Sequence, residues 1–298
     1  MRIPGASILN RTLMVIIVSL SMNSCFKGVE ETPWEVADHP PMLVVDATIT
    51  NERKQHEVRL TLSNAYFSPS VPPAVSGAAV SVNDGDSIFT YPESMTEPGM
   101  YVSESSFAGV PGKTYHLMIT LDAPVNGMKE YHSLSVMPEG VNIDSIYSEI
   151  YEYPKGLSEE NDATPDTTVL VVFYFGREPE TAGNYYFAKI YSNHRPLFYT
   201  IKDFPLSDDK YRNGQYVNLM TMIKNVSAND TVLFELFSTA KEYNQFLDAA
   251  SKIDMSGDIN SPTGPPANAV GNVAGALGFF LVTYTSSGSS LAIDKRDL

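Results

Sequence analysis

Five histidines and one cysteine are the most reactive side chains of this 298-residue chain, and their spacing limits the chemistry available to them. The histidines form neither an H-E-x-x-H motif nor another paired spacing on one helix face. They stand at His39, His56, His116, His132 and His194. His116 and His132 fall on neighbouring predicted strands and are the only conceivable metal pair. Two half-exposed strand histidines are the more common arrangement, so we expect no metal and no cofactor.

The carboxylates suggest no clearer catalytic arrangement, because they gather in loops and turns, where acidic side chains are usual. Asp84 and Asp86 flank Gly85 and could suggest a calcium loop, but the spaced ligands and closing glutamate of such a loop are missing. Asp-Gly between two strand-like runs instead predicts a β-hairpin. A G-x-S-x-G nucleophile motif is also missing. We therefore expect a protein that is not an enzyme; a hydrolase with an unrecognised carboxylate site is the remote alternative.

The single cysteine, Cys25, follows a segment that resembles a bacterial lipoprotein signal. Residues 13–20 (LMVIIVSL) form an apolar run that is too short to span a bilayer, which takes about 20 residues. Small Ser24 directly precedes the cysteine, and in such signals cleavage occurs there before the cysteine is acylated. Acyl chains anchor a soluble domain to a membrane. We predict that residues 1–24 are a signal peptide and that Cys25 is the lipidation site.

The segment behind the cysteine, residues 25–41, is acidic and rich in proline, which is typical of a tether. Acidic residues at this place resemble a surface-export signal of some Gram-negative lipoproteins. We therefore expect a lipid-anchored protein on the outer membrane, exposed at the cell surface. Removal of residues 1–24, which contain Arg2 and Arg11 and no acid, takes the formal charge from −15 to −17. A surface of this sign repels nucleic acid.

Short strand-like runs with regular turn signals dominate the rest of the chain and predict a predominantly all-β fold. Residues 42–140 are predicted to form an immunoglobulin-like or prealbumin-like β-sandwich, in which runs such as 58–62 (VRLTL) alternate apolar and polar side chains. The strand-like run 42–50 and the run 58–62 are predicted to pair as an antiparallel hairpin across the charged turn 51–57. Residues 141–168, which are polar, acidic and contain proline, read as a linker. Residues 169–298 are predicted to form a second β-rich, sandwich-like domain, beginning with the apolar strand 169–175.

One short α-helix is predicted near residues 239–251 of this second domain. Thr239 and Glu242 have the spacing of a capping box. An apolar stripe follows and favours core packing; it consists of Tyr243, Phe246, Leu247 and Ala250. Further along, Gly275 and Gly278 precede a strongly apolar run, which predicts a bulge or a close backbone approach.

A tyrosine cluster offers the clearest candidate for a binding surface. Tyr147, Tyr151 and Tyr153 lie beside Glu149 and Glu152. Tyrosine combines a large contact area with a polar tip, and it is frequent at interfaces. Strand tyrosines that close a sandwich would give the same pattern, so a ligand or partner surface and a packing role both stay open here.

In the order and spacing of its motifs, the chain resembles the lipoproteins catalogued as domain of unknown function 4249. Besides Cys25, the matching segments are residues 43–50, 76–82, 99–101, 112–117, 142–146 and 271–280. The resemblance implies a two-part β-rich protein of the outer membrane without known catalytic residues. It also implies that TonB-dependent outer-membrane transporters are neighbours of such proteins. We therefore predict an accessory that captures ligand for such a transporter or docks on it; the alternative is an adhesin-like or structural surface lipoprotein.

Overall fold

The computed structural model describes residues 40–64, 70–152, 168–198, 200–224, 226–256 and 269–294. Over these residues the chain forms two β-sheets and one α-helix, which confirms the predicted all-β class with a single short helix. The predicted signal peptide and most of the predicted tether lie outside the described residues. From Pro40 onward, the chain belongs to one compact unit.

The smaller sheet has the antiparallel order β4-β3-β6-β7. Its strands are β3 (Ala79–Asn83), β4 (Ile88–Tyr91), β6 (Thr114–Val125) and β7 (Met128–Val136). The Asp-Gly hairpin is confirmed, because β3 pairs with β4 and Gly85 has a φ of 93°. The Nζ of Lys113 lies 2.7 Å from a carboxylate oxygen of both Asp84 and Asp86, so an ion pair accounts for these two acids.

The larger sheet has a main path of seven strands in the order β11-β10-β14-β15-β1-β2-β5. These are β11 (Arg195–Pro196), β10 (Tyr185–Ser192), β14 (Thr231–Thr239), β15 (Leu277–Asp294), β1 (Leu43–Thr50), β2 (Glu57–Leu62) and β5 (Met100–Val102). Four further strands join this path: β12 (Leu206–Asp208) pairs with β10, and β8 (Asn142–Glu152), β9 (Thr168–Arg177) and β13 (Tyr216–Lys224) continue in that order from β15. The β1–β2 hairpin agrees with the sequence prediction.

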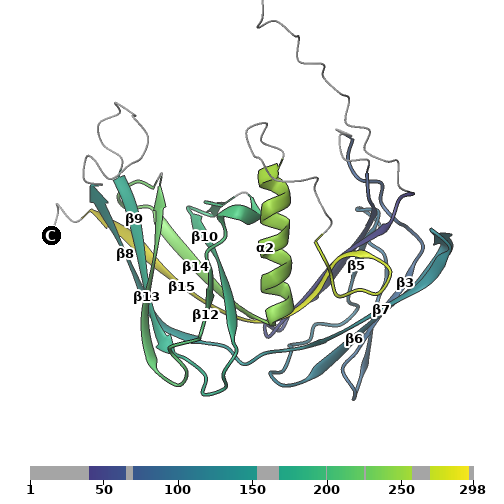
Figure 1. Ribbon diagram of the computed structural model, residues 1–298, viewed down its shortest axis with the longest axis horizontal. Coiled ribbons are helices and arrows are strands. Elements are labelled where there is room, and N and C mark those ends of the chain that lie inside the picture. The colour runs from purple at the N-terminus through teal and green to yellow at the C-terminus, as the bar shows by residue number, and fades with distance from the viewer. Residues whose placement is uncertain are drawn as a thin grey trace, which may run out of the picture. The chain divides into compact units, whose positions relative to one another are not determined.

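The long strand β15 links the two ends of this sheet, because it changes partners along its length (Figure 1). Residues 277–283 run parallel to β1, residues 284–291 run antiparallel to β14, and residues 292–294 run parallel to β8. The small side chains of residues 285–290 (TSSGSS) permit this change of pairing partners. A Cβ atom added at Gly288 would lie 3.0 Å from the Ile146 side chain.

Two predictions about domain organisation are corrected by this topology. The first part of the predicted linker is wrong, because residues 142–152 form β8. The predicted division between residues 42–140 and 169–298 is also incomplete, since β15 pairs with β1 and contributes Phe280 and Val282 to the same core as Leu43 and Leu117. The first sandwich is thus completed by a strand more than 200 residues further along the chain.

A second core is formed by side chains on one face of β8, β9, β10, β14 and the end of β15. Its buried side chains include Leu170, Val172 and Tyr174 from β9 and Val232 and Phe234 from β14. Each of these sets occupies alternate strand positions and points to one face of the sheet. The continuous apolar run of β9 therefore divides into an inward set and an outward set.

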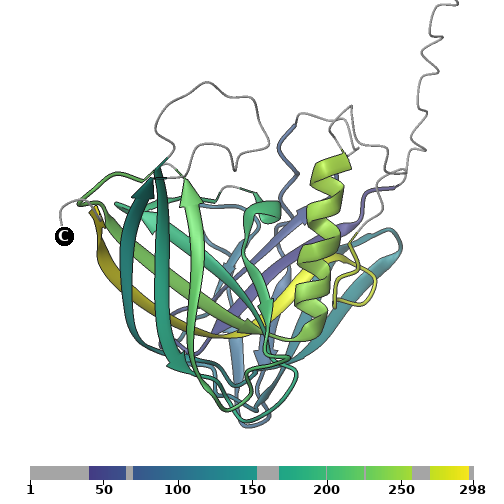
Figure 2. The same ribbon diagram turned by 60° about the vertical axis from the view of Figure 1, so that its left-hand side comes forward.

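The helix α2 (Lys241–Ser256) packs beside β10, β14 and β15 (Figures 1 and 2). The predicted apolar stripe is confirmed as packing: Leu247 is buried, and Tyr243 and Phe246 contact the ring of Phe279, with ring centroids 4.9 and 5.3 Å away. The predicted capping box is wrong. Thr239 ends β14, and its hydroxyl donates to the Tyr185 carbonyl oxygen at 3.4 Å.

Candidate binding surface

The outward face of β8 and β9 carries a stack of aromatic side chains. The ring of Tyr147 lies on that of Phe173, with centroids 4.5 Å apart and planes at 15°. The centroid of the Phe175 ring lies 5.8 Å from that of Tyr147. Tyr147 and Phe173 are opposite residues in the β8–β9 ladder. Because side chains alternate along a strand, the outward position of Phe173 follows from the inward position of Val172 and Tyr174.

The surface that carries this aromatic stack continues onto β13 and is partly accessible. Met220 is opposite Phe173 in the β9–β13 ladder and is 60% exposed, while Tyr147 is 38% exposed. Figure 2 shows β8, β9 and β13 side by side, without the helix over them. We call the surface formed by Tyr147, Phe173, Phe175 and Met220 the aromatic face.

The three predicted surface tyrosines are placed differently by the structure. Tyr147 lies at the centre of the aromatic face. Tyr151 lies on the same side of β8, opposite Val169, and its hydroxyl donates to the Glu149 carboxylate. Tyr153 and the predicted lipidation site Cys25 lie outside the described residues. The sequence prediction missed Phe173 and Phe175, although seven consecutive apolar residues in an antiparallel strand already imply that both faces are apolar.

An open cavity of about 790 Å³ lies at the beginning of β13. Its ionisable lining residues are mostly acidic; they are Glu139, Asp144, Glu178 and Glu180, against the single base Arg177. Tyr216, the first residue of β13, is 57% exposed and hydrogen bonds to Asp144. The cavity therefore offers a site of negative potential next to the edge of the sheet.

Glu178 is the buried member of this acidic group, with 3% of its surface exposed. Burial raises the pKa of its carboxyl group, and the nearby Asp209 acts in the same direction. The Tyr186 hydroxyl donates to a Glu178 carboxylate oxygen at 2.7 Å. The carboxylate of Asp209 accepts from the backbone amides of Gly183 and Asn184, at 2.8 and 3.0 Å. These bonds fix the loop between β9 and β10 against the cavity.

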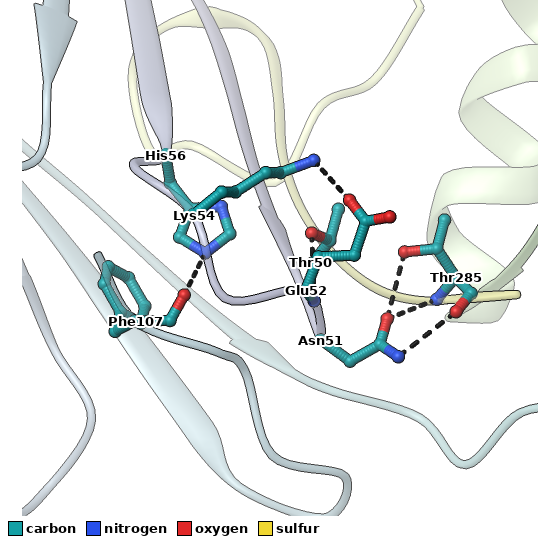
Figure 3. Close-up of polar contacts among 7 residues, drawn as sticks. All are labelled: Thr50, Asn51, Glu52, Lys54, His56, Phe107 and Thr285. Carbon is teal, nitrogen blue, oxygen red and sulfur yellow. Dashed lines mark hydrogen bonds and ion pairs between the residues drawn. The ribbon is translucent and has the colours of Figure 1, made fainter.

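A second, smaller cavity of about 440 Å³ lies beside the β1–β2 turn, and His56 is among the residues that line it. The His56 side chain is 2% exposed, and its Nε2 lies 3.0 Å from the Phe107 carbonyl oxygen (Figure 3). A carbonyl oxygen only accepts, so Nε2 carries the proton. Burial lowers the pKa of His56 to about 4. This histidine is therefore a neutral structural group at pH 7.

His116 and His132 do meet on the smaller sheet, as the sequence suggested, with ring centroids 6.2 Å apart. The two rings are almost perpendicular, at 88°. Across the residues that the structure describes, no group of three or more His, Cys, Asp or Glu side chains could hold a metal ion. We therefore do not assign His116 and His132 as a metal site.

Comparison with known proteins adds a family but no activity. A family model described as "Domain of unknown function (DUF4249)" matches residues 29–289, which confirms the resemblance drawn from the motifs. No curated protein matches the chain. Within the described part of the chain, no helix has both the length and the apolar character needed to cross a membrane.

Proposed function

Because this chain belongs to the DUF4249 family, whose description assigns no activity, we propose a role from its exposed surfaces and its predicted anchor. The protein acts as a non-enzymatic lipoprotein on the outer membrane, anchored through Cys25 and exposed at the cell surface. It binds a TonB-dependent outer-membrane transporter through the aromatic face and assists ligand capture by that transporter.

The observation that supports this proposal best is the stacking of the exposed Tyr147 ring on the half-buried Phe173 ring. The inward side chains of β9 already form a core, so the outward rings are not needed to hold the sheet to that core. Aromatic side chains and methionine are enriched in the buried centres of protein interfaces. Tyrosine in particular is frequent among the few residues that dominate binding energies.

The test is native purification of the tagged full-length protein from outer membranes, comparing the wild type with Tyr147→Ser. The matched control is Leu134→Ser, which removes another exposed apolar side chain, 63% exposed, from β7 of the other sheet. We expect a transporter to co-purify with the wild type and the control. Recovery with Tyr147→Ser should fall on the order of tenfold, the effect of losing about 1.4 kcal/mol of binding energy.

Two results would contradict the proposal. One is equal recovery of the transporter with wild type and Tyr147→Ser. The other is the lack of any co-purifying transporter, together with unchanged nutrient uptake after deletion of the protein. Binding to neighbouring or host cells that does not depend on a transporter would instead favour the adhesin-like alternative.

A further inference from the structure

The outer edge of β13 is unusually open for a strand of its length. Its nine residues pair with β9 without a register shift, and no other described strand pairs with it (Figure 2). Proteins usually protect such edges with short strands, charges, proline or bulges. The sequence YVNLMTMIK has no proline and only one charge, at its last residue.

The other strands at the ends of the two sheets, among the described residues, show this usual protection. β11 has two residues, β5 and β12 have three, and β4 has four. β7 is as long as β13, but it carries Lys129 and Glu130. The long edge of β13, with its one charge at the last residue, therefore differs from these other terminal strands.

The direction of the free backbone groups follows from one hydrogen bond. The Glu178 amide donates to the Gln215 carbonyl oxygen at 2.9 Å, which marks these opposite residues as a bonded pair. Bonded and non-bonded pairs alternate along an antiparallel ladder. The N–H and C=O groups of Thr221 therefore face β9, whereas those of Met220 face the open edge. The same holds for the other even-numbered residues of β13.

We propose that this edge binds an extended segment of a protein partner by strand addition, with a basic residue of that segment next to Tyr216. The segment adds antiparallel to β13, since antiparallel pairing is slightly the more stable arrangement. Its backbone bonds to Met220 and the other even-numbered residues. The inference deepens the proposed function and rests on it, because it assumes that this side of the sheet meets a protein.

Charge identifies the basic end of the segment. The cavity beside Tyr216 is lined by four carboxyl groups and one guanidinium group, and the whole chain has a formal charge of −15. An antiparallel segment places its C-terminal end beside Tyr216, where β13 begins. Arginine or lysine at that end meets the acidic cavity, whereas an acidic residue there is repelled.

The first test uses a defined probe, a capped nine-residue peptide of alternating valine and threonine with arginine at its C-terminal end. Two comparison peptides replace the arginine by glutamate or carry N-methyl groups on alternate amides. We expect the arginine peptide to bind the full-length protein in calorimetry. Both changes should weaken binding on the order of tenfold or more. Absence of binding by the arginine peptide, or equal binding of the N-methylated peptide, overturns the proposal.

The second test separates the edge from the aromatic face. Met220→Pro removes an N–H that faces the open edge and leaves the ladder to β9 intact. Edge positions of this kind tolerate proline. Met220→Ala removes the same side chain but keeps the N–H. We expect peptide binding to be lost only with Met220→Pro. Equal loss with both variants would mean that the side chain holds the peptide, which overturns strand addition but leaves the proposed function standing.

A measurement on the wild type keeps the test independent of how Met220→Pro folds. Saturating arginine peptide should slow hydrogen exchange of the Met220 amide and leave the Thr221 amide, which is already bonded to β9, unchanged. Unchanged exchange at Met220 overturns the proposal.

Dimerisation of the protein through β13 would also overturn the proposal, since the occupant of the edge would then be a second copy. Normal transporter recovery with Tyr147→Ser, together with peptide binding, would reject only the role of the aromatic face.

Discussion

The side-chain amide of Asn51 holds both backbone groups of Thr285, although 234 residues separate them (Figure 3). Its Oδ1 accepts from the Thr285 N–H at 2.6 Å, and its Nδ2 donates to the Thr285 carbonyl oxygen at 3.1 Å. The last backbone pair between β1 and β15 is Thr50 with Thr283. At the point where β15 leaves β1, the Asn51 side-chain amide therefore takes the place of a backbone group and continues the pairing.

Loss of this amide should destabilise the protein. We expect Asn51→Ala to lower the free energy of unfolding by about 1–3 kcal/mol, the usual cost of leaving backbone groups without their partner. Asn51→Asp should cost less, because it keeps the acceptor for the Thr285 N–H. Urea unfolding measures both, with the exposed Asn213→Ala as control. Equal stability of Asn51→Ala and the control would contradict the prediction.

Gly278 is expected to tolerate no side chain. Its φ is +86°, and an added Cβ would lie 2.0 Å from the Val45 carbonyl oxygen. This confirms the close backbone approach that the sequence predicted. Gly278→Ala should lower the free energy of unfolding by more than about 3 kcal/mol, because strain and a backbone clash add.

Gly85→Ala is the control for Gly278→Ala. Gly85 has a similar φ of +93° but nothing within 4 Å of the added Cβ, so only the backbone strain of about 1 kcal/mol remains. Thermal unfolding compares the two variants. Similar losses of stability would show that the clash with Val45 does not matter.

The neutral state of His56 predicts a dependence of stability on pH. Burial lowers its pKa to about 4, against about 6.5 in an unfolded chain. Between these values the unfolded chain binds a proton that the folded chain does not. Stability therefore falls as pH drops from 6.5 to 4, by at most about 1.4 kcal/mol per pH unit from this group.

His56→Gln tests this contribution. The glutamine amide can still donate to the Phe107 carbonyl oxygen, but it does not titrate. Urea unfolding at pH 7, 5.5 and 4.5 should show a shallower decline for the variant than for the wild type. Carboxylates titrate in both proteins, so the difference between the two curves isolates the histidine. Identical slopes would contradict the assignment.

The contact between α2 and the sheet depends on Leu247. This side chain is 2% exposed and belongs to the cluster with Phe187, Phe279 and Leu281. Leu247→Ala should lower the free energy of unfolding by about 2–4 kcal/mol, because it leaves a cavity. Lys252→Ala, which removes only an exposed ion pair with Asp248, should cost less than about 0.5 kcal/mol. Comparable losses in urea unfolding would place Leu247 outside the core.

Part of the binding surface was predictable from local sequence. Tyr147 and Tyr151 alternate with the inward Ser148 and Ile150, so their shared outward side follows from the period of two. The partners of Tyr147 were not predictable, because Phe173 reaches it only through the register of β8 with β9. The open edge of β13 was not predictable for the same reason, because a strand lies at an edge only when no second strand pairs with it in the folded sheet.

By itself, the sequence determined what depends on neighbouring residues: the β1–β2 hairpin, the Asp84–Gly85 turn and the apolar stripe of α2. Only the tertiary structure decided that β15 completes the first sandwich, that residues 142–152 form a strand and that His56 is buried. The physical reason lies in the range of the forces. Side-chain periodicity and turn preference act within a few residues, whereas the pairing of Ala47 with Phe280 is selected by the burial of a whole sheet face.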